Sequence, residues 1–328
     1  MQLILDDFGV FLGKKGNCFT IKNKEKTDEY SADIIDQIKV VSPCSLSSSA
    51  VKLAMENNID IVFTNKFGNP FGRIYPCKLG GTTLTRKKQA ESYLSQKGFF
   101  IVKSLIIGKL RNQENLLKSL SKTRNGIFNT EIAQIENLFK HIDLINGKNI
   151  DEVRESLLGI EGQTASIYFS CISRIVPLDK RDHEAKDIFN ISLNYGYGIL
   201  YSEIERACII SGLDPYLGFF HTDRYGKPSL VLDMIEPFRQ PIVDRAIINL
   251  FVQKQMDNSD LECVGEEIFL TKKGREKIIK MVLERLNLEI LFNNKKMSFQ
   301  SIILEKSREL VRFILEQSPD YKPFIYRG

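Results

Sequence analysis

Apolar and polar residues alternate over short distances in the first 76 residues of the chain. The runs QLILD, GVFLG, CFTIKN, DQIKVVS, IDIVFTN and GRIYP are separated by Gly, Asn and Asp, which is typical of strands joined by turns. One stretch, SSSAVKLAMENN, instead has apolar residues at helical spacing at Val51, Ala54 and Met55. We therefore predict a small β-rich domain over residues 1–76, with one helix among its strands.

The tract PCKLGGTTLTRKK follows this domain. It contains a proline, a glycine pair and several small hydroxyl residues, and it ends in three basic residues. Such punctuation is typical of a connection between domains. We expect a linker over residues 77–90 and a second domain over residues 91–328.

Beyond residue 90, apolar positions recur every three or four residues, which is the helical period. One helix is expected in NIDEVRESLLGIEGQTASIYFSCISRI, with Asp151 as a plausible N-cap. Others are expected over residues 91–120, 193–211, 229–254, 271–291 and 297–317. The tail DYKPFIYRG is short and basic, and we expect it to be loosely held. The expected fold class is α+β, with a small N-terminal β-rich domain followed by a larger all-α-helical domain.

Length and composition are those of an ordinary globular protein. A chain of 328 residues exceeds what one hydrophobic core usually serves, and a hydrophobic content of 43% is ordinary. The first residues resemble no signal peptide, and the chain has no apolar run of about 18 residues that could span a bilayer. The six cysteines show no C-x-x-C spacing. We expect a reduced, cytoplasmic protein without membrane contact.

Charge is distributed unevenly along the chain. Residues 81–130 carry ten Lys and Arg against two Asp and Glu, whereas residues 131–270 carry 13 against 23. Residues 271–328 are basic again, with 13 against seven. Basic flanks suit a polyanion such as nucleic acid, because phosphate contacts release counterions. The alternative is that they are solvated helix faces.

A carboxylate lies among the apolar positions of the helix expected after Asp151. Glu161 is in line with the inward positions Leu157, Leu158, Ala165, Tyr168 and Ile172. A buried carboxylate needs a proton, a basic partner or a metal ion. Gly159 and Gly162 flank it, which suggests the close approach of a backbone or ligand. The alternative is a core salt bridge to Arg174 or Arg206.

The stretch GFFHTDRYGKPSLVLDMIEPFR holds a second group of candidate ligands. His221 is expected on a short connector between two turns, and a helix follows in which Asp233 and Glu236 share a face. Pro237 and Pro241 should kink that helix. If Glu161 joins these residues, the carboxylates and the imidazole suit Mg or Mn. The alternative for His221 is a hydrogen-bonded core histidine.

Three motifs resemble a known family. LLGIEGQTASIYF, NISLNYGYGILYSEIERACIISGLDPYLGFFHTDRYGKPSLVLDMIEPFR and IVDRAI, in this order, resemble the CRISPR adaptation integrase, the CRISPR-associated endonuclease that inserts new spacers. The resemblance extends over the whole predicted helical domain. It implies a small N-terminal β domain, a flexible junction and a larger α-helical catalytic domain.

The resemblance also implies which residues form the site. Glu161 in G-x-E-G, His221 in G-F-x-H and Glu236 in the following helix match the family's metal ligands, and Asp233 matches a supporting acidic position. The chain departs from the family in KRDHEAKDIFN, before Asn190, where many relatives carry a proline-rich segment. This departure leaves the metal site intact but removes support for carrying over the family's DNA contacts to residues 180–187.

The implied function is a metal-dependent integrase that joins the 3′-hydroxyl ends of a short DNA duplex to the CRISPR repeat by transesterification, with an associated nuclease activity. The expected partners are double-stranded DNA (the protospacer and the repeat), a second copy of the chain and a small companion protein of the adaptation module. Two other classes stay open. One is a general structure-specific nuclease, and the other is a DNA-binding scaffold whose acids form only core salt bridges.

Five basic residues are candidates for phosphate contacts. Arg86, Lys87 and Lys88 end the predicted linker tract, and Arg224 and Lys227 lie on the turn after His221. Solvated surface positions are the alternative for all five.

Overall fold

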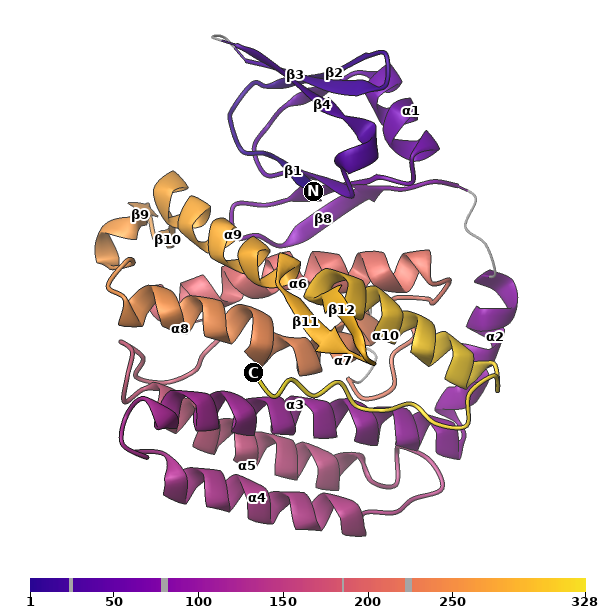
Figure 1. Ribbon diagram of the computed structural model, residues 1–328, viewed down its shortest axis with the longest axis vertical. Helices are drawn as coiled ribbons and strands as arrows, with labels where there is room; N and C mark the ends of the chain where they lie inside the picture. The colour runs from indigo at the N-terminus through magenta and orange to yellow at the C-terminus, as the bar shows by residue number, and fades with distance from the viewer. Residues whose placement is uncertain (24–25, 78–81, 185, 222–225) are drawn as a thin grey trace. The chain divides into compact units, whose positions relative to one another are not determined.

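The computed structural model describes residues 1–328 except 24–25, 78–81, 185 and 222–225. The chain divides into two compact units, Met1–Leu79 and Gly80–Gly328. The first unit is rich in strands and the second is mostly helical, which confirms the predicted fold class (Figure 1).

The described part of the first unit contains two four-stranded sheets. One has the order β1-β5-β7-β8, in which only β8 is antiparallel to its neighbour, and the other has the order β4-β3-β2-β6. The strands are β1 (Gln2–Leu5), β2 (Phe11–Lys15), β3 (Cys18–Lys22), β4 (Thr27–Ser31), β5 (Gln37–Val40), β6 (Ser45–Leu46), β7 (Asp60–Thr64) and β8 (Pro70–Ile74). Helix α1 (Ser48–Glu56) is capped by Ser47, whose side chain accepts from the backbone N–H of Ala50.

All six predicted strand runs overlap strands, and α1 lies within the predicted helical stretch. The strands missed were β4 and β6. The sequence of β4, TDEYS, is polar because β4 is an edge strand that pairs only with β3 and is largely solvated. Two-residue β6 is too short to show a period.

The second unit begins with α2 (Thr82–Tyr93), which occupies most of the segment predicted as a linker. Its inward positions are polar, because Thr85, Gln89 and Ser92 are buried. The Gln89 side chain donates to the carbonyls of Asp214 and Leu217 at 2.9 and 2.7 Å. A helix that is held by polar contacts shows no apolar period, and this is why the sequence pattern did not reveal it.

The other α-helices described in this unit surround one hydrophobic core. Helices α3, α4 and α5 pack against one another, and α6 packs against α7, α9 and α10 (Figure 1). The helices are α3 (Gln96–Lys122), α4 (Asn129–Leu144), α5 (Arg154–Ile172), α6 (Ile188–Ile210), α7 (Ser229–Phe238), α8 (Arg245–Val252), α9 (Lys272–Asn287) and α10 (Phe299–Ile314).

The predicted helix over residues 229–254 is divided into three parts. After α7, a π-helical segment η2 (Arg239–Asp244) leads into α8. Pro237 lies inside α7 and Pro241 inside η2. Since proline lacks a backbone N–H, this is where the regular α-helical ladder has to change, and the kink itself stays a prediction.

Two hairpins show that the second unit is not all-α. Strands β9 (Leu261–Val264) and β10 (Glu267–Leu270) form one, and β11 (Glu289–Phe292) and β12 (Lys295–Ser298) form the other. The helix predicted over residues 271–291 ends earlier, at Asn287. The turn of the second hairpin is Asn293–Asn294, both with positive φ, and this tight turn was overlooked as a hairpin signal.

The prediction that the tail is loosely held is wrong. Tyr321 and Phe324 are only 8% and 2% exposed. The tail runs beside α3, as Figure 1 shows at the yellow end of the chain. Its apolar residues are buried between helices, which composition alone does not reveal. Among the described residues, no helix combines the length and the apolar character that a membrane span requires.

Candidate metal centre

Glu161 is carried by α5, but the start of this helix differs from the prediction. The helix begins at Arg154, so Asp151 is not its N-cap. Asp151 instead accepts hydrogen bonds from Arg154 at 2.9 Å and Tyr93 at 3.0 Å. Arg154 also donates to the carbonyl of Phe220, beside His221. Asp151, which was expected to cap the helix, therefore holds Arg154 in place. Arg154 in turn joins α5 to the connector that carries His221.

The face of α5 around Glu161 is partly open. Leu158, expected to be buried, is 42% exposed, so the apolar stripe is narrower than predicted. A Cβ added at Gly159 or Gly162 would meet no described atom within 4 Å. The described protein therefore provides no backbone that packs against these glycines, and the surface beside Glu161 is accessible to a ligand.

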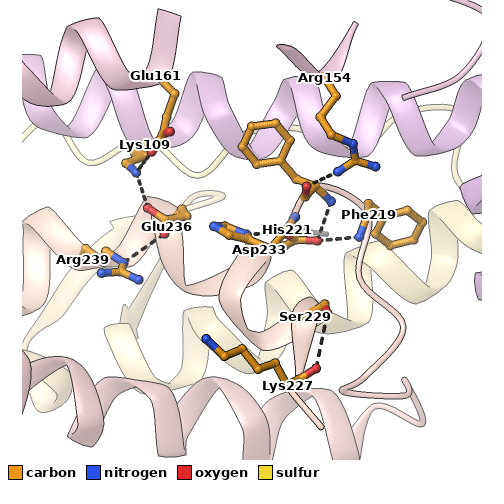
Figure 2. Close-up of polar contacts among 11 residues, drawn as sticks. Lys109, Arg154, Glu161, Phe219, His221, Lys227, Ser229, Asp233, Glu236 and Arg239 are labelled. Atoms are coloured by element: carbon orange, nitrogen blue, oxygen red, sulfur yellow. Dashed lines mark hydrogen bonds and ion pairs between the residues drawn. The ribbon is translucent and has the colours of Figure 1, made fainter. Parts of the chain in front are cut away.

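The partner of Glu161 is Lys109 of α3, rather than either arginine considered from the sequence. Lys109 forms an ion pair with Glu161, and its Nζ also lies 2.6 Å from Oε2 of Glu236 on α7 (Figure 2). Arg174 pairs with Glu131 at 2.6 Å. Lys109 lies within the apolar run SLIIGKL, which indicates burial. We overlooked this signal because Lys109 was counted with the other basic residues of segment 81–130.

Lys109, Glu161 and Glu236 form a cluster of interacting charges. Burial opposes the charge on Lys109, but the carboxylates of Glu236 and Glu161 outweigh it and raise the pKa of Lys109. Burial favours neutral Glu236, but the charges of Arg239 and Lys109 prevail and lower the pKa of Glu236 to about 2. The Nε of Arg239 lies 3.2 Å from Oε1 of Glu236. The carboxylate of Glu236 is therefore held ionised by nearby cations.

Asp233 organises the connector that carries His221. Its carboxylate accepts from the backbone N–H groups of Phe219, Phe220 and His221 at 2.6, 3.0 and 3.0 Å. It also lies 2.7 Å from Nδ1 of His221 (Figure 2). A ring nitrogen facing a carboxylate carries the proton, which leaves Nε2 as the nitrogen that can bind another partner.

His221 is not an enclosed core residue, because its side chain is 35% exposed. Burial lowers its affinity for a proton, but the hydrogen bond to Asp233 and the negative charges of Asp233 and Glu236 together outweigh this effect and raise the pKa of His221. The imidazole is therefore oriented by a buried carboxylate on one side and accessible on the other.

A small cavity lies at the centre of these residues. Its volume is about 10 Å³, which is room for about one water molecule. Lys109, Glu161, Phe220, Asp233 and Glu236 line it, together with apolar residues of α3. Within the part of the chain that the structure describes, no three His, Cys, Asp or Glu side chains lie close enough to hold a metal ion. The ammonium of Lys109 is itself a cation and lies between the carboxylates of Glu161 and Glu236.

A second buried network, which sequence reasoning missed, supports Arg239. Tyr168 and Tyr197 donate to the two carboxylate oxygens of Asp244 at 2.8 and 2.5 Å. The guanidinium of Arg239 lies over the Tyr197 ring, 4.5 Å from its centroid. Burial raises the pKa of Asp244, although the two hydroxyl bonds act against it. The network fixes Arg239 next to Glu236.

The candidate DNA contacts that the structure describes lie on exposed or partly exposed positions. Lys87 is exposed on α2, whereas Arg86 lies 4.0 Å from Asp214 and Lys88 pairs with Glu91 at 2.7 Å. These contacts restrain two of the three side chains. The exposed Lys227 precedes α7, and Arg224 lies outside the described residues.

Part of the positive charge of residues 81–130 is neutralised by carboxylates of the protein itself. Lys109 faces two carboxylates of the site, and Lys118 pairs with Glu114 and Glu136 at 2.5 and 2.8 Å. Since Glu161, Glu236 and Glu136 belong to the acidic segment that follows, the two segments partly compensate each other. The charge count therefore overstated the surface available to a polyanion.

Asn190 organises the segment that departs from the family pattern. Its side chain accepts from Arg181 at 2.6 Å and from the backbone N–H of Asp182 at 3.1 Å, and it donates to the carbonyl of Lys180 at 2.8 Å. The segment is thus folded back onto the start of α6, although it lacks the proline-rich sequence.

Comparisons with known sequences agree with the motif resemblance. A family model described as "CRISPR associated protein Cas1" matches residues 3–284. The chain is 34% identical to the CRISPR-associated endonuclease Cas1 1 of Archaeoglobus fulgidus over 348 aligned positions, covering 100% of each chain. It is 37% identical to the Cas1 1 endonuclease of Pyrobaculum aerophilum over 251 residues, 76% of this chain and 82% of that protein.

Solved structures show the same fold. A casposase bound to an integration product has a TM-score of 0.82 at 24% identity, covering 98% of this chain and 92% of that one. A Cas1 protein from Thermotoga maritima has a TM-score of 0.79 at 22% identity, covering 99% and 100%. A chain of a Cas6-RT-Cas1–Cas2 complex has a TM-score of 0.80 at 18% identity, covering 99% of this chain and 36% of that one.

Proposed function

The chain belongs to the Cas1 family of CRISPR-associated endonucleases, and we propose that it inserts spacers by metal-dependent transesterification of DNA 3′-hydroxyl ends at the CRISPR repeat. The observation that carries this proposal is that two distant parts of the chain, α5 and the stretch made of α7 and its preceding connector, meet around Lys109 of α3. Helix α5 contributes Glu161, helix α7 contributes Asp233 and Glu236, and the connector before α7 contributes His221 (Figure 2).

The proposed ligands are Glu161, His221 through Nε2, and Glu236. The donor set of two carboxylates and one imidazole suits Mg or Mn. The Oε2 atom of Glu236 is buried and, among the described residues, has no hydrogen bond of good geometry, although Lys109 Nζ is 2.6 Å away. A divalent ion would satisfy this oxygen, provided that the Lys109 side chain withdraws. The residues fit the ion on these grounds.

When bound, the ion would supply Lewis-acid polarisation of the scissile phosphate and stabilise its developing charge. Asp233 would keep the Nε2 lone pair of His221 available by holding the proton on Nδ1. Arg239 would help to keep Glu236 ionised. Because the DNA 3′-hydroxyl is the attacking group, no covalent nucleophile of the protein is required. The open face at Gly159 and Gly162 would admit the DNA backbone next to Glu161.

We assign DNA phosphate contacts to Arg86, Lys87, Lys88 and Lys227, and extend this assignment to Arg224 from the sequence alone. The exposure of Lys87 and Lys227 supports it most directly. Such contacts position the duplex without reading its sequence.

We also propose that the protein acts as a homodimer together with a small companion protein of the adaptation module. The companion protein is supported by the fold shared with the chain of a Cas6-RT-Cas1–Cas2 complex, and the homodimer rests on the family resemblance. Light scattering of the chain alone and with the companion protein would test both associations.

The test of the function is strand joining into a plasmid that contains the CRISPR repeat, with Mn²⁺ and with chelator. We expect joined products only with metal, and loss of joining in the ligand variants. A general nuclease would cleave the duplex without joining it. A scaffold would bind DNA equally well with chelator and show no turnover.

A further inference from the structure

The tail of the chain forms an ordered segment, which we call the C-terminal strap and define as Tyr321–Tyr326. It follows α3 in the same direction (Figure 1). Four hydrogen bonds tie it there: Ser104 to the Tyr321 carbonyl at 2.8 Å, Asn112 to the Phe324 carbonyl at 3.1 Å, the Tyr326 N–H to Asn112 at 2.7 Å, and Asn115 to the Tyr326 carbonyl at 2.8 Å. The strap is thus attached to α3 over its full length.

Side chains from other helices hold the C-terminal strap as well. The ring of Phe324 stacks on Phe238 of α7 at a centroid distance of 4.6 Å. The buried Lys306 of α10 donates to the carbonyl of Lys322 at 2.5 Å and lies 4.4 Å from the ring centroid of Tyr321. The strap therefore lies in the core of the second unit and directly contacts the helix that carries Asp233 and Glu236.

The carbonyl of Pro237 lies where the α-helical hydrogen-bond pattern of α7 gives way to the π-helical segment η2. In an α-helix it would accept the N–H four residues later, but that residue is Pro241, which has none. The side-chain Nδ2 of Asn112 donates a hydrogen bond to the Pro237 oxygen instead, at 2.6 Å. The carbonyl of Pro241 is satisfied by Arg285, which also lies over the ring of Tyr326. Residues that contact the strap therefore donate to the carbonyls of both Pro237 and Pro241.

The strap also fixes which way the Asn112 amide points. Because the Tyr326 N–H donates to Oδ1 of Asn112, the NH₂ group lies at the other end of the amide, where it donates to the carbonyls of both Pro237 and Phe324. Space at this junction is minimal. A Cβ at Gly108 would lie 3.0 Å from the Phe324 carbonyl oxygen and 3.1 Å from Cβ of Pro237. Helices α3 and α7 and the strap meet here, next to Lys109.

We propose that the C-terminal strap, acting through Asn112, positions α7 and thereby sets the metal affinity of the site. The inference rests on the proposed function, because Glu236 directly precedes Pro237 and is a proposed ligand. The strap touches neither ion nor DNA in this proposal. It orients one amide, and this amide holds the carbonyl at which α7 is interrupted.

Asn112→Ala and Asn115→Ala form a matched pair, because both residues bond the strap from α3 and only Asn112 also reaches α7. Mn²⁺ affinity is measured by electron paramagnetic resonance and α7 by hydrogen exchange without metal. We expect Asn112→Ala to weaken Mn²⁺ binding about 10-fold, as the removal of a residue that supports a metal ligand does, and to speed exchange over Ser229–Phe238. Asn115→Ala should change neither. Equal effects in both variants, or none in either, would overturn the proposal.

A second pair tests the strap end itself and guards against misfolding of the Asn112 variant. Tyr326→Ala removes the ring but keeps the N–H, whereas Tyr326→Pro removes both. Only the proline variant should weaken Mn²⁺ binding strongly, and similar affinities would count against the proposal. If the His221→Ala variant binds Mn²⁺ as the unaltered protein does, the proposed metal site is wrong instead. The strap is then judged on the hydrogen exchange of α7 alone, where equal rates in the two asparagine variants reject it.

Discussion

Helices α2 and α3 follow each other in the chain and use lysine in opposite ways. Lys87 of α2 is exposed, whereas the side chain of Lys109 of α3 is only 11% exposed and faces Glu161 and Glu236. Both lysines belong to the same strongly basic segment. A net charge over a segment therefore combines surface cations, which can release counterions from DNA, with internal cations that neutralise buried carboxylates.

The strongest way to break the internal site is to remove a proposed ligand. Glu161→Ala and His221→Ala should each abolish strand joining and Mn²⁺ binding, because the proposed ion would lose a ligand. The fold and the dimer should persist, which circular dichroism and light scattering can verify. Joining at the unaltered rate in either variant, with metal present, would refute the metal assignment.

Removing the internal cation should have the next largest effect. Lys109→Met leaves Glu161 and Glu236 without their shared partner, and breaking a buried ion pair from one side typically costs about 3–5 kcal/mol. Thermal unfolding should therefore occur at lower temperature, and Mn²⁺ should recover part of the loss by neutralising the same carboxylates.

Lys97→Met is the matched control for this variant, because Lys97 lies on the same helix but pairs with the exposed Glu316. It should change the unfolding temperature little, with or without Mn²⁺. If both variants behave alike, Lys109 is not the counter-ion of the site.

Asp233 and Glu236 lie one helical turn apart, and their substitution should reduce Mn²⁺ binding to different degrees. Glu236→Gln should lose Mn²⁺ binding, since Glu236 is a proposed ligand. Asp233→Asn should weaken binding and joining by about 10- to 100-fold, because it disturbs the carboxylate that orients His221. Titration with Mn²⁺ and joining rates distinguish them. The assignment is reversed if the Asp233 variant loses the metal while the Glu236 variant retains it.

The surface cations should give the smallest effect. Replacing Arg86, Lys87 and Lys88 by Ala should weaken DNA binding and flatten its salt dependence by at most about three units, roughly one for each phosphate that is no longer neutralised. We expect less than this maximum, because Arg86 and Lys88 already face carboxylates. Lys52→Ala, an exposed lysine of the first unit, is the control. An unchanged salt slope in the triple variant would show that these residues only solvate α2.

Elements with a regular apolar period could be predicted from the sequence. Helices α1 and α10 and most strands of the first unit are of this kind, because an apolar period of two or of 3.6 residues shows which face of the element is buried. No such apolar period is present in helix α2, with its buried Gln89, or in the edge strand β4. Their stability comes from polar contacts and strand pairing, which depend on distant parts of the chain.

The candidate site could be predicted only for residues with evident chemistry. His221, Asp233 and Glu236 were found because they cluster in one stretch, and Glu161 because a carboxylate stood in an apolar helix. Lys109 and Asn112 were missed, since their roles exist only where α3 meets α5, α7 and the C-terminal strap. A lysine or asparagine is ordinary in sequence until its partners are known.

The distance in sequence between Asn112 and Tyr326 has a consequence for how the protein folds. The two residues are 214 positions apart, so their hydrogen bond closes a loop that contains most of the second unit. Such distant contacts are slow to form because chain entropy is lost before they contribute. We expect refolding to produce helices first and Mn²⁺ binding later, when the strap docks. Stopped-flow circular dichroism and Mn²⁺ binding followed in parallel would reveal the delay, whereas coincident traces would contradict it. The reactive centre of this nuclease would thus be among the last parts of the protein to form, after the scaffold that confines it.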